Sequence, residues 1–267
     1  MNEESAYSIG QSNEALKFMK FRTADRCCGF MRDLVTSNSR ILDCGCGPGS
    51  ITVGLAQWAS EGYVIGIDAA ESPLDSARAL AKELDLANVE FNQADVYNLP
   101  FEDEGFDLVF SSAMFCHLSG LDRVLAEIKR VLKPGGIVTI RDIIFDSAVM
   151  YPQDELLKEY YEILGLGMKH YGGNPNVGRE LGELLSSAGF SDVILTVGTN
   201  QPVNSSERAE YYSSVANLLS KELSELAVAN GWVTADRLDQ IFRRFESLHS
   251  EPGAISVVLY GQVVGRK

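Results

Sequence analysis

The sequence predicts a doubly wound α/β fold, in which helices cover both faces of a parallel sheet. Between residues 40 and 142, short β-branched runs alternate with stretches of helical length, a pattern typical of parallel βαβ units. The connections of such units are right-handed, which makes the doubly wound arrangement the default. A chain of 267 residues with 45% apolar side chains can also bury a substantial core.

The elements of this alternating part follow from the spacing of its apolar residues. The expected strands are 41–43, 63–68, 89–91, 106–111 and 137–141. The expected helices between them are 51–58, 74–84 and 121–131. Before the first strand, a polar tail leads into an apolar, helix-compatible run that begins at Ala15 and continues to Leu34. We therefore treat residues 1–37 as a separate N-terminal segment.

The remainder of the chain, from 143 onward, predicts helical insertions and two further strands. Helices are expected at 154–164 and 178–188, strands at 190–197 and 255–264. Asn204 can cap a helix with Glu207 at its third position. Two sets of apolar residues then each share one helix face: Tyr211, Val215, Leu218, Leu219 and Leu223, and Leu238, Ile241, Phe242, Phe245 and Leu248. The last strand is long enough for an edge strand, and we expect one domain over 38–267 with helical insertions at about 150–188 and 204–249.

Charge and hydropathy restrict the partners. With 23 Lys and Arg against 37 Asp and Glu, the formal charge is −14, which repels a nucleic-acid backbone. No apolar run approaches the ~18 to 20 residues that span a bilayer. Glu3 and Glu4 stand where a signal peptide carries basic residues. We expect neither nucleic acid nor a membrane span, and we interpret the chain as cytoplasmic.

The five cysteines agree with a reducing compartment. Their number is odd and Cys27 and Cys28 are adjacent, which argues against a disulfide framework. Cys44, Cys46 and the Cys116–His117 pair include metal-ligand types, but no C-x-x-C or H-x-x-x-H pair occurs. We expect no metal site.

The most informative segment is the glycine cluster that follows the first strand. Gly45, Gly47 and Gly49 come between that strand and a helical stretch, where a ligand can meet a helix N-terminus. Glycine allows positive φ in such a turn and lets a ligand lie against the backbone. The dinucleotide pattern G-x-G-x-x-G fails because Ser50 stands at its third glycine, and no Gly-Lys-Ser/Thr follows. What remains is an acid, Asp43, two residues before G-x-G-x-G.

Further motifs follow in a fixed order. The second strand ends in Asp68, where a carboxylate can accept both ribose hydroxyls of an adenosine. The third strand leads to a turn that contains Asp95 and Val96. Three more motifs are 99–101 (Leu-Pro-Phe), 105–109 (Gly-Phe-Asp-Leu-Val) and 132–136 (Leu-Lys-Pro-Gly-Gly).

Taken together, these motifs resemble class I S-adenosylmethionine-dependent methyltransferases of the small-molecule type found in ubiquinone and menaquinone biosynthesis. The resemblance covers roughly residues 15–200. It implies a Rossmann-like, seven-stranded, mostly parallel sheet whose last strand is antiparallel, S-adenosyl-L-methionine as cofactor, S-adenosyl-L-homocysteine as product, and a small-molecule methyl acceptor. The residues that it places at the cofactor are Arg22, Asp43, Gly45, Gly47, Asp68, Asp95, Val96 and Ser111.

The resemblance also assigns roles to these residues. Backbone groups of Gly45, Gly47 and Ser111 would hold the methionine moiety, and Arg22 would reach its carboxylate. Asp68 would take the ribose, and Asp95 with Val96 would take the adenine.

Each of these residues also has a plainer interpretation. Asp43 could only orient the glycine loop by accepting backbone N–H groups. Asp68 could cap a strand end, Asp95 could stabilise a turn, and Arg22 could be a solvated helix residue. His117 follows the fourth strand, where it could be a general base or could shape the substrate pocket.

The cofactor chemistry explains why no catalytic triad is needed. An activated methyl group requires mainly alignment and dry surroundings, and a base only for a protonated, weakly acidic acceptor. The candidates for acceptor contact are His117, Asp142, Tyr151, Tyr160 and His170. We also expect the N-terminal segment to close over the cofactor as a lid, with Phe18 or Phe21 facing inward.

Two other functions compete with methyl transfer. A nicotinamide-dependent oxidoreductase shares the glycine turn and the acid after the second strand, although Ser50 and the Asp95 turn argue against it. A noncatalytic or repurposed S-adenosylmethionine-binding protein shares every motif, because the cofactor site is separate from acceptor choice. The motifs do not reveal whether carbon, oxygen, nitrogen or sulfur is methylated.

Overall fold

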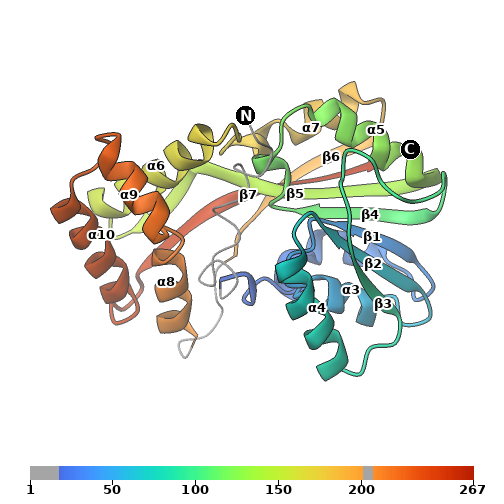
Figure 1. The fold of residues 1–267 in the computed structure, drawn as a ribbon, viewed down its shortest axis with the longest axis horizontal. Helices are drawn as coiled ribbons and strands as arrows, with labels where there is room; N and C mark the ends of the chain where they lie inside the picture. Colours follow the sequence, from blue (N-terminus) through green and yellow to red (C-terminus); the bar gives the residue numbers. More distant parts are fainter. Residues whose placement is uncertain (1–17, 201–206) are drawn as a thin grey trace.

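The computed structural model describes residues 18–200 and 207–267, which form one seven-stranded sheet between two layers of helices (Figure 1). Its strand order is β3-β2-β1-β4-β5-β7-β6. The strands are β1 (Arg40–Cys44), β2 (Tyr63–Asp68), β3 (Val89–Gln93), β4 (Phe106–Ser112), β5 (Leu132–Tyr151), β6 (Ser191–Gly198) and β7 (Ile255–Arg266). β7 pairs antiparallel with both of its neighbours, β5 and β6, and all the other strand pairs are parallel. The expected doubly wound sheet with an antiparallel last strand is confirmed.

Helices cover both faces of this sheet. The α-helices are α2 (Ala24–Cys27), α3 (Thr52–Trp58), α4 (Glu71–Glu83), α5 (Leu121–Val131), α6 (Glu155–His170), α7 (Leu181–Ser187), α8 (Arg208–Ala216), α9 (Lys221–Ala229) and α10 (Ala235–Leu248). The short 3-10 helices are η2 (Gly29–Leu34), η3 (Phe115–His117) and η4 (Val177–Arg179). Figure 1 shows α3 and α4 on one side of the sheet and α5 and α7 on the other.

Alternation along the strands explains the two layers. Ile41 of β1 points into a core with Leu108 and the residues of α2, η2 and α3. The next residue, Leu42, points the other way, into the core that α5 completes with Val124 and Ile128. The α5 boundaries coincide with the expected 121–131, because its buried residues keep a strict helical spacing.

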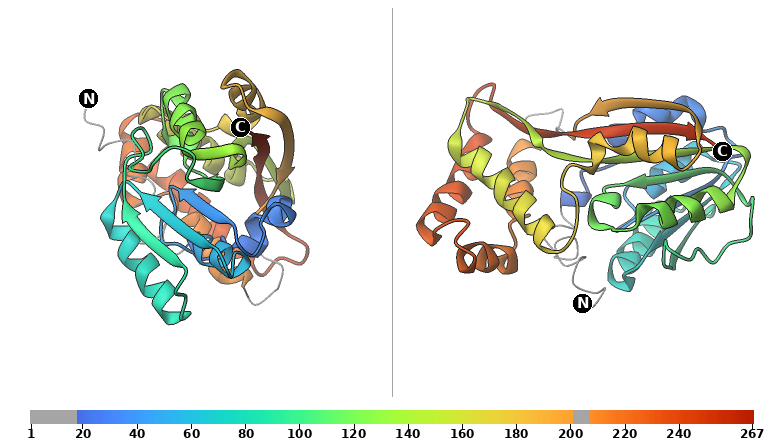
Figure 2. Two further views of the ribbon diagram at one scale, coloured as in Figure 1. Left: turned by 90° about the vertical axis from the view of Figure 1, so that its right-hand side faces the viewer. Right: turned by 90° about the horizontal axis from the view of Figure 1, so that it is seen from above.

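The strands β5 and β7 are longer than expected and reach beyond the rest of the sheet (Figure 2). β5 continues past 141 and pairs with β7 as far as Tyr151, after an irregularity between Ile144 and Val149. The prediction that 255–264 forms an edge strand is wrong. β7 lies between β5 and β6, and β6 is the edge, with Ile194 and Val197 about 60% exposed.

A helical cap lies beyond the end of β5 and the start of β7 (Figure 1). We define the cap as α6, α8, α9 and α10. Its centre is aromatic: the rings of Tyr160 and Phe245 lie 4.2 Å apart between centroids, and both are fully buried. The apolar face expected from Tyr211 to Leu223 is divided between two helices, because the chain leaves α8 at Asn217 and Ser220 caps α9. Asn204 lies outside the described residues.

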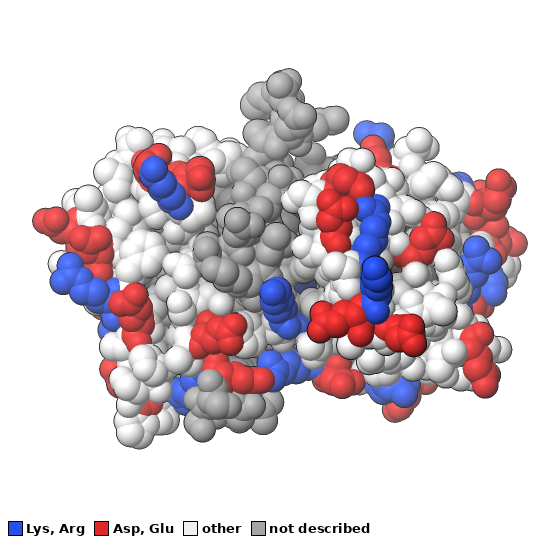
Figure 3. Space-filling model, turned by 60° about the horizontal axis from the view of Figure 1, so that its bottom comes forward, with Lys and Arg blue, Asp and Glu red and all other residues white. Residues whose placement is uncertain are grey.

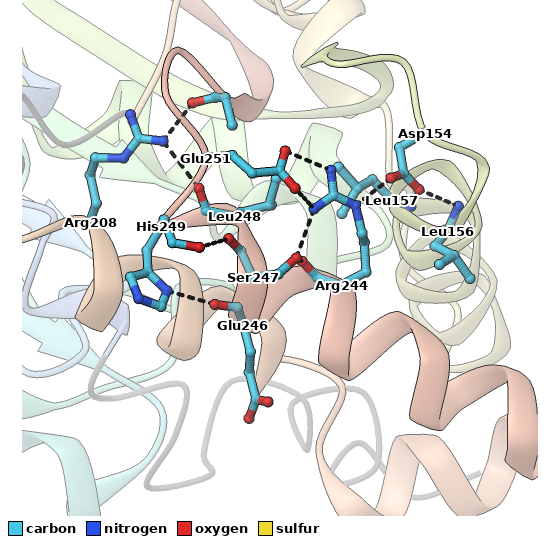
Figure 4. Close-up of polar contacts among 12 residues, drawn as sticks. Asp154, Leu156, Leu157, Arg208, Arg244, Glu246, Ser247, Leu248, His249 and Glu251 are labelled. Atoms are coloured by element: carbon cyan, nitrogen blue, oxygen red, sulfur yellow. Dashed lines mark hydrogen bonds and ion pairs between the residues drawn. The ribbon is translucent and has the colours of Figure 1, made fainter.

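An ion-pair network joins two helices of the cap, α6 and α10 (Figure 4). Arg244 of α10 pairs with Asp154 and, at 2.7 Å, with Glu251. Asp154 is also the N-cap of α6 and accepts from the Leu156 amide at 2.9 Å. One guanidinium therefore fixes the start of α6 against the end of α10.

Candidate functional site

The glycine loop lies at the carboxyl end of β1 and is held by backbone bonds to β2. Gly45, Gly47 and Gly49 all have positive φ, between 53° and 76°. The amides of Gly45 and Cys46 donate to the Ile67 carbonyl at 2.8 and 2.9 Å. The loop therefore has one fixed shape at the edge where doubly wound sheets bind ligands.

The three glycines have different surroundings. A Cβ at Gly49 would lie 2.7 Å from the Ala77 Cβ, and one at Gly45 would lie 2.9 Å from Met114. A Cβ at Gly47 would meet nothing closer than the Met19 sulfur, at 3.4 Å. Gly49 is thus required by the packing of α4, whereas Gly47 is the glycine with room beside it.

The two carboxylates at the loop are both buried and have different partners. Asp43 accepts a hydrogen bond from the Thr52 hydroxyl at 2.7 Å, and burial raises its pKa to about 7. Asp68 accepts from the Gly47 amide at 2.9 Å and from the Ala70 amide at 3.0 Å. Asp68 therefore accepts from the loop backbone, which is the orienting role that was considered for Asp43. Asp43 binds the Thr52 hydroxyl instead.

A pocket opens between the glycine loop, the end of β4 and the N-terminal segment. Five of the residues expected at the site line it: Arg22, Asp43, Gly45, Gly47 and His117. The other lining residues were not expected, and they include Met19, Cys46, Ser112 and Met114. Alternation along β4 could have revealed Ser112, because successive strand residues face opposite sides of the sheet.

Arg22 enters this pocket from the N-terminal segment. Its side chain is 8% exposed, and its Nη2 donates to the Ser112 hydroxyl at 2.6 Å. The backbone nearby is held by the Ser50 hydroxyl, which donates to the Met19 carbonyl at 2.9 Å. Within the described residues, the helix-compatible run from 15 to 34 does not form one helix: between Arg22 and β1 it forms the short helices α2 and η2.

The aromatic residues of this segment point away from the pocket. Phe18 and Phe21 pack on Tyr211 of α8, with ring centroids 6.0 and 5.8 Å away. The expectation that one of them faces the cofactor is wrong. Residues three apart share a side of a turn, so Phe18 and Phe21 face the cap while Met19 and Arg22 face the loop.

Four expected cofactor residues lie outside the pocket lining: Asp68, whose contacts are given above, and Ser111, Asp95 and Val96. Ser111 is fully buried, and its hydroxyl has no partner among the described residues. Asp95 is exposed and accepts from the Tyr97 amide at 2.9 Å, as expected of a turn. Val96 is buried in the core that α5 covers. The structure therefore brings together the residues expected at the methionine end, apart from Ser111, and leaves those expected at the ribose and the adenine outside the pocket lining.

His117 lies on η3, half-buried in the pocket wall. Burial lowers its pKa to about 4, and the positive charge of Arg22 contributes to the shift. The imidazole is therefore neutral at pH 7 and is a weak base.

The other candidates for acceptor contact are scattered. Asp142 is buried and accepts from the Ile143 amide at 2.8 Å and the Cys116 amide at 3.3 Å. Tyr160 donates to the Val215 carbonyl inside the cap. Tyr151 is 64% exposed, and His170 is exposed beside Trp232. None of these four lines the pocket.

Residues 18–200 and 207–267 contain neither a metal-ligand cluster nor a membrane-spanning helix. In these ranges no group of three or more His, Cys, Asp or Glu could hold a metal ion. No helix there has both the length and the apolarity to cross a membrane. Cys27, Cys28, Cys44, Cys46 and Cys116 are all buried free thiols.

Known proteins share this sequence and fold. A model of the methyltransferase-domain family matches residues 35–188. An uncharacterized methyltransferase of Schizosaccharomyces pombe is 37% identical over 184 residues, which are 66% of this chain and 65% of the relative. The chain spans about half to two thirds of the length of the curated relatives it matches.

Two solved structures share the fold at low identity. Haemonchus contortus phosphoethanolamine N-methyltransferase 2, in complex with phosphomonomethylethanolamine and S-adenosylhomocysteine, has a TM-score of 0.59 at 18% identity and covers 100% of this chain and 60% of its own. The [4+2]-cyclase SpnF has a TM-score of 0.55 at 22% identity and covers 96% of this chain and 82% of its own. With the glycine loop, the sheet order and the family match over more than half of its length, the chain belongs to the methyltransferase-domain family of S-adenosylmethionine-dependent methyltransferases.

Proposed function

We propose that this protein transfers a methyl group from S-adenosyl-L-methionine to a small-molecule acceptor by in-line displacement. The observation that carries the proposal is the pocket that joins an open Gly47, the buried Arg22 and the end of β4. A structure with the same fold, from Haemonchus contortus, contains a small amine substrate and S-adenosylhomocysteine, which supports a small-molecule acceptor.

The methionine end of the cofactor fits the pocket lining. Arg22 has a buried Nε with no partner among the described residues, so one charged donor is available for a carboxylate. The free space beside Gly47 lets an amino acid lie against the loop backbone. We assign Arg22, Gly45, Gly47 and the backbone of Ser111 to this end, and Asp43 to the support of the loop through Thr52.

The adenosine end belongs beside β2. Asp68 already receives the Gly47 amide on Oδ2, so a ribose bound by this carboxylate would lie next to the loop. A carboxylate has about four acceptor positions, so it can accept from several donors at once. We assign the ribose to Asp68, and the adenine to Asp95 and Val96 in the following turn.

The residues of the chain contribute orientation and exclusion of water. When bound, the cofactor supplies a methyl group that is already activated on a sulfonium. Met19 and Arg22 cover the loop, and residues 1–37 act as a lid segment that limits solvent access. His117, neutral at pH 7, contacts and orients the acceptor, and removes a proton only from an acceptor acidic enough for a weak base.

The test is turnover with direct detection of the product. The protein is incubated with S-adenosylmethionine and a panel of phenols, amines, thiols and carboxylic acids, and S-adenosylhomocysteine is quantified by mass spectrometry. We expect product with at least one acceptor class and calorimetric binding of S-adenosylmethionine but not of NAD. Binding of NAD alone would contradict the proposal and favour the oxidoreductase.

The likeness to a [4+2]-cyclase supports a second candidate, a chain that binds S-adenosylmethionine without transferring its methyl group. The same experiment separates the two functions. Tight cofactor binding with no S-adenosylhomocysteine formed from any acceptor would favour the second candidate.

A further inference from the structure

Two buried arginines lie at the carboxyl end of the sheet without a carboxylate partner. Arg141 of β5 is fully buried and Arg22 is 8% exposed. The Arg141 Nη2 donates to the Asn200 side-chain oxygen at 2.5 Å, and its guanidinium lies 3.6 Å from the centre of the Tyr260 ring. Its Nε and Nη1 have no hydrogen-bond partner in the described chain.

The two arginines approach each other on one face of the sheet. Arg141 stands opposite Ser112 in the β4–β5 register, and the Ser112 hydroxyl accepts from Arg22 at 2.6 Å. Burial lowers the pKa of Arg141, and the positive charge of Arg22 lowers it further. The protein thus places two like charges close together inside a low-dielectric region.

The surface cations are arranged differently. Figure 3 shows Lys and Arg side chains beside Asp and Glu on one face of the molecule. Arg130, for example, pairs with Glu127 at 2.8 Å, and Arg237 pairs with Glu159 at 2.7 Å. No ion pair within 4.0 Å links Arg22 or Arg141 to a carboxylate of the described residues.

The nearby buried carboxylates, Asp43 and Asp142, act on Arg22 through their charge but take their hydrogen bonds from other groups. Asp43 binds the Thr52 hydroxyl, and Asp142 accepts from two backbone amides. On the side chains of Arg22, Arg141 and Asn200 the unpartnered groups are all donors: Nε of Arg22, Nε and Nη1 of Arg141, and the amide nitrogen of Asn200. A buried donor without an acceptor costs about 1 to 3 kcal/mol, and more when it is charged. A set made only of donors is completed by an anion.

We propose that Arg141 and Asn200, next to Arg22, form a subsite for a carboxylate of the methyl acceptor. The inference rests on the proposed function, because the subsite adjoins the pocket through Arg22. Tyr260 covers one face of the Arg141 guanidinium, so a ligand meets its donors in the guanidinium plane, which suits a planar carboxylate. Arg141 is fully buried and does not line the pocket itself, so the proposal requires the anion to reach it past Arg22.

The experiment uses matched acid and amide probes on the full chain saturated with S-adenosylhomocysteine. Benzoate is compared with benzamide, and acetate with acetamide, at constant ionic strength by thermal shift and calorimetry. We expect the acids to raise the melting temperature and the amides to leave it unchanged. Equal responses to acid and amide in both pairs would overturn the subsite.

Variants then locate the response. Arg141→Met should weaken acid binding at least tenfold, and Arg141→Lys should fall between it and the wild type, because lysine keeps the charge and loses the planar fork. Arg179→Met is the control, since that arginine is about half exposed and paired with Asp146. Unchanged acid binding in a folded Arg141→Met chain would overturn the proposal.

The affinity for S-adenosylhomocysteine separates this inference from the proposed function. We expect Arg141→Met to bind it as the wild type does. If that affinity falls with the substitution, Arg141 serves the cofactor and the acceptor subsite is wrong. If the wild type itself does not bind S-adenosylhomocysteine, the proposed function fails instead.

Discussion

The glycine loop and the helical cap are built in different ways. The loop is fixed through its main chain. Three of its glycines have positive φ, two of its amides donate to the Ile67 carbonyl, and the Gly47 amide donates to the Asp68 carboxylate. Side chains fix the cap, through the Tyr160–Phe245 contact and the Arg244 network. Backbone demands leave a readable pattern of glycine and aspartate, whereas packing demands accept many apolar sequences.

The largest effect that we expect comes from Gly49, where the loop meets α4. Gly49→Val introduces a branched side chain at positive φ and 2.7 Å from the Ala77 Cβ. Backbone strain and overpacking together should lower the free energy of unfolding by about 2 to 6 kcal/mol, measured by urea denaturation. Gly47→Val is the control: it shares the strain of a positive φ but has nothing nearer than 3.4 Å, so it lacks the overpacking and should lose less. Equal losses would contradict the distinction between the two glycines.

The second prediction concerns the cap. Arg244→Ala removes both carboxylate contacts of a side chain that is 13% exposed, and should lower the free energy of unfolding by about 2 kcal/mol. The affinity for S-adenosylhomocysteine should stay unchanged, because the cap network lies away from the loop. Arg243→Ala is the matched control. The Arg243 side chain is 76% exposed, and its ion pair with Asp239 is long, at 3.8 Å. A loss of cofactor affinity in Arg244→Ala would show that the two regions are coupled.

The third prediction uses pH. Burial raises the pKa of Asp154, but the Arg244 contact and the helix amides outweigh it and hold the pKa below its ordinary value. The ionised form therefore stabilises the fold above the unfolded-state pKa, near 4, and this stabilisation is lost as the pH falls through the lower folded-state value. The free energy of unfolding should fall less steeply below pH 4 in Arg244→Ala than in the wild type. Parallel curves would contradict this account of Asp154.

The smallest effect is expected at His117. Its folded pKa of about 4 lies below the ordinary value near 6.5, so stability from the neutral ring is present above pH 6.5 and is lost as the pH falls toward 4. The imidazole resonances of His117 should therefore not shift between pH 8 and 6 in the native protein. In urea the same resonances should titrate near pH 6.5. A native midpoint near 6.5 would restore His117 as an ordinary base.

The same contrast explains what could be predicted from the sequence. The strands from β1 to β4, the α5 boundaries and the loop glycines follow from local patterns, and the structure has them where expected. The extension of β5 to Tyr151 could not be predicted, because the residues around Asp146 break the strand pattern and only pairing with β7 continues it. The interior place of β7 likewise depends on its two partners, β5 and β6.

Within the candidate site, the sequence predicted which residues lie near the glycine loop better than it predicted the directions in which their side chains point. Arg22 and Gly47 line the pocket, but so do Met19 and Met114, whose flexible side chains carry no motif. Phe18 and Phe21 are apolar enough to cover a cofactor, yet Tyr211 of α8 receives them. The sequence around 18–21 contains no trace of this partner, because the contact joins segments far apart in the chain.

The central claim is that the glycine-loop edge binds S-adenosylmethionine through its ribose at Asp68. Calorimetry with S-adenosylhomocysteine tests it on the wild type, on Asp68→Ala, and on Asp75→Ala, whose carboxylate on α4 is 75% exposed. Charge-assisted bonds worth roughly 1.5 to 3 kcal/mol predict that Asp68→Ala binds about tenfold to a hundredfold more weakly, while Asp75→Ala binds as the wild type does. Equal affinity of Asp68→Ala and the wild type, with both chains folded, would contradict the claim.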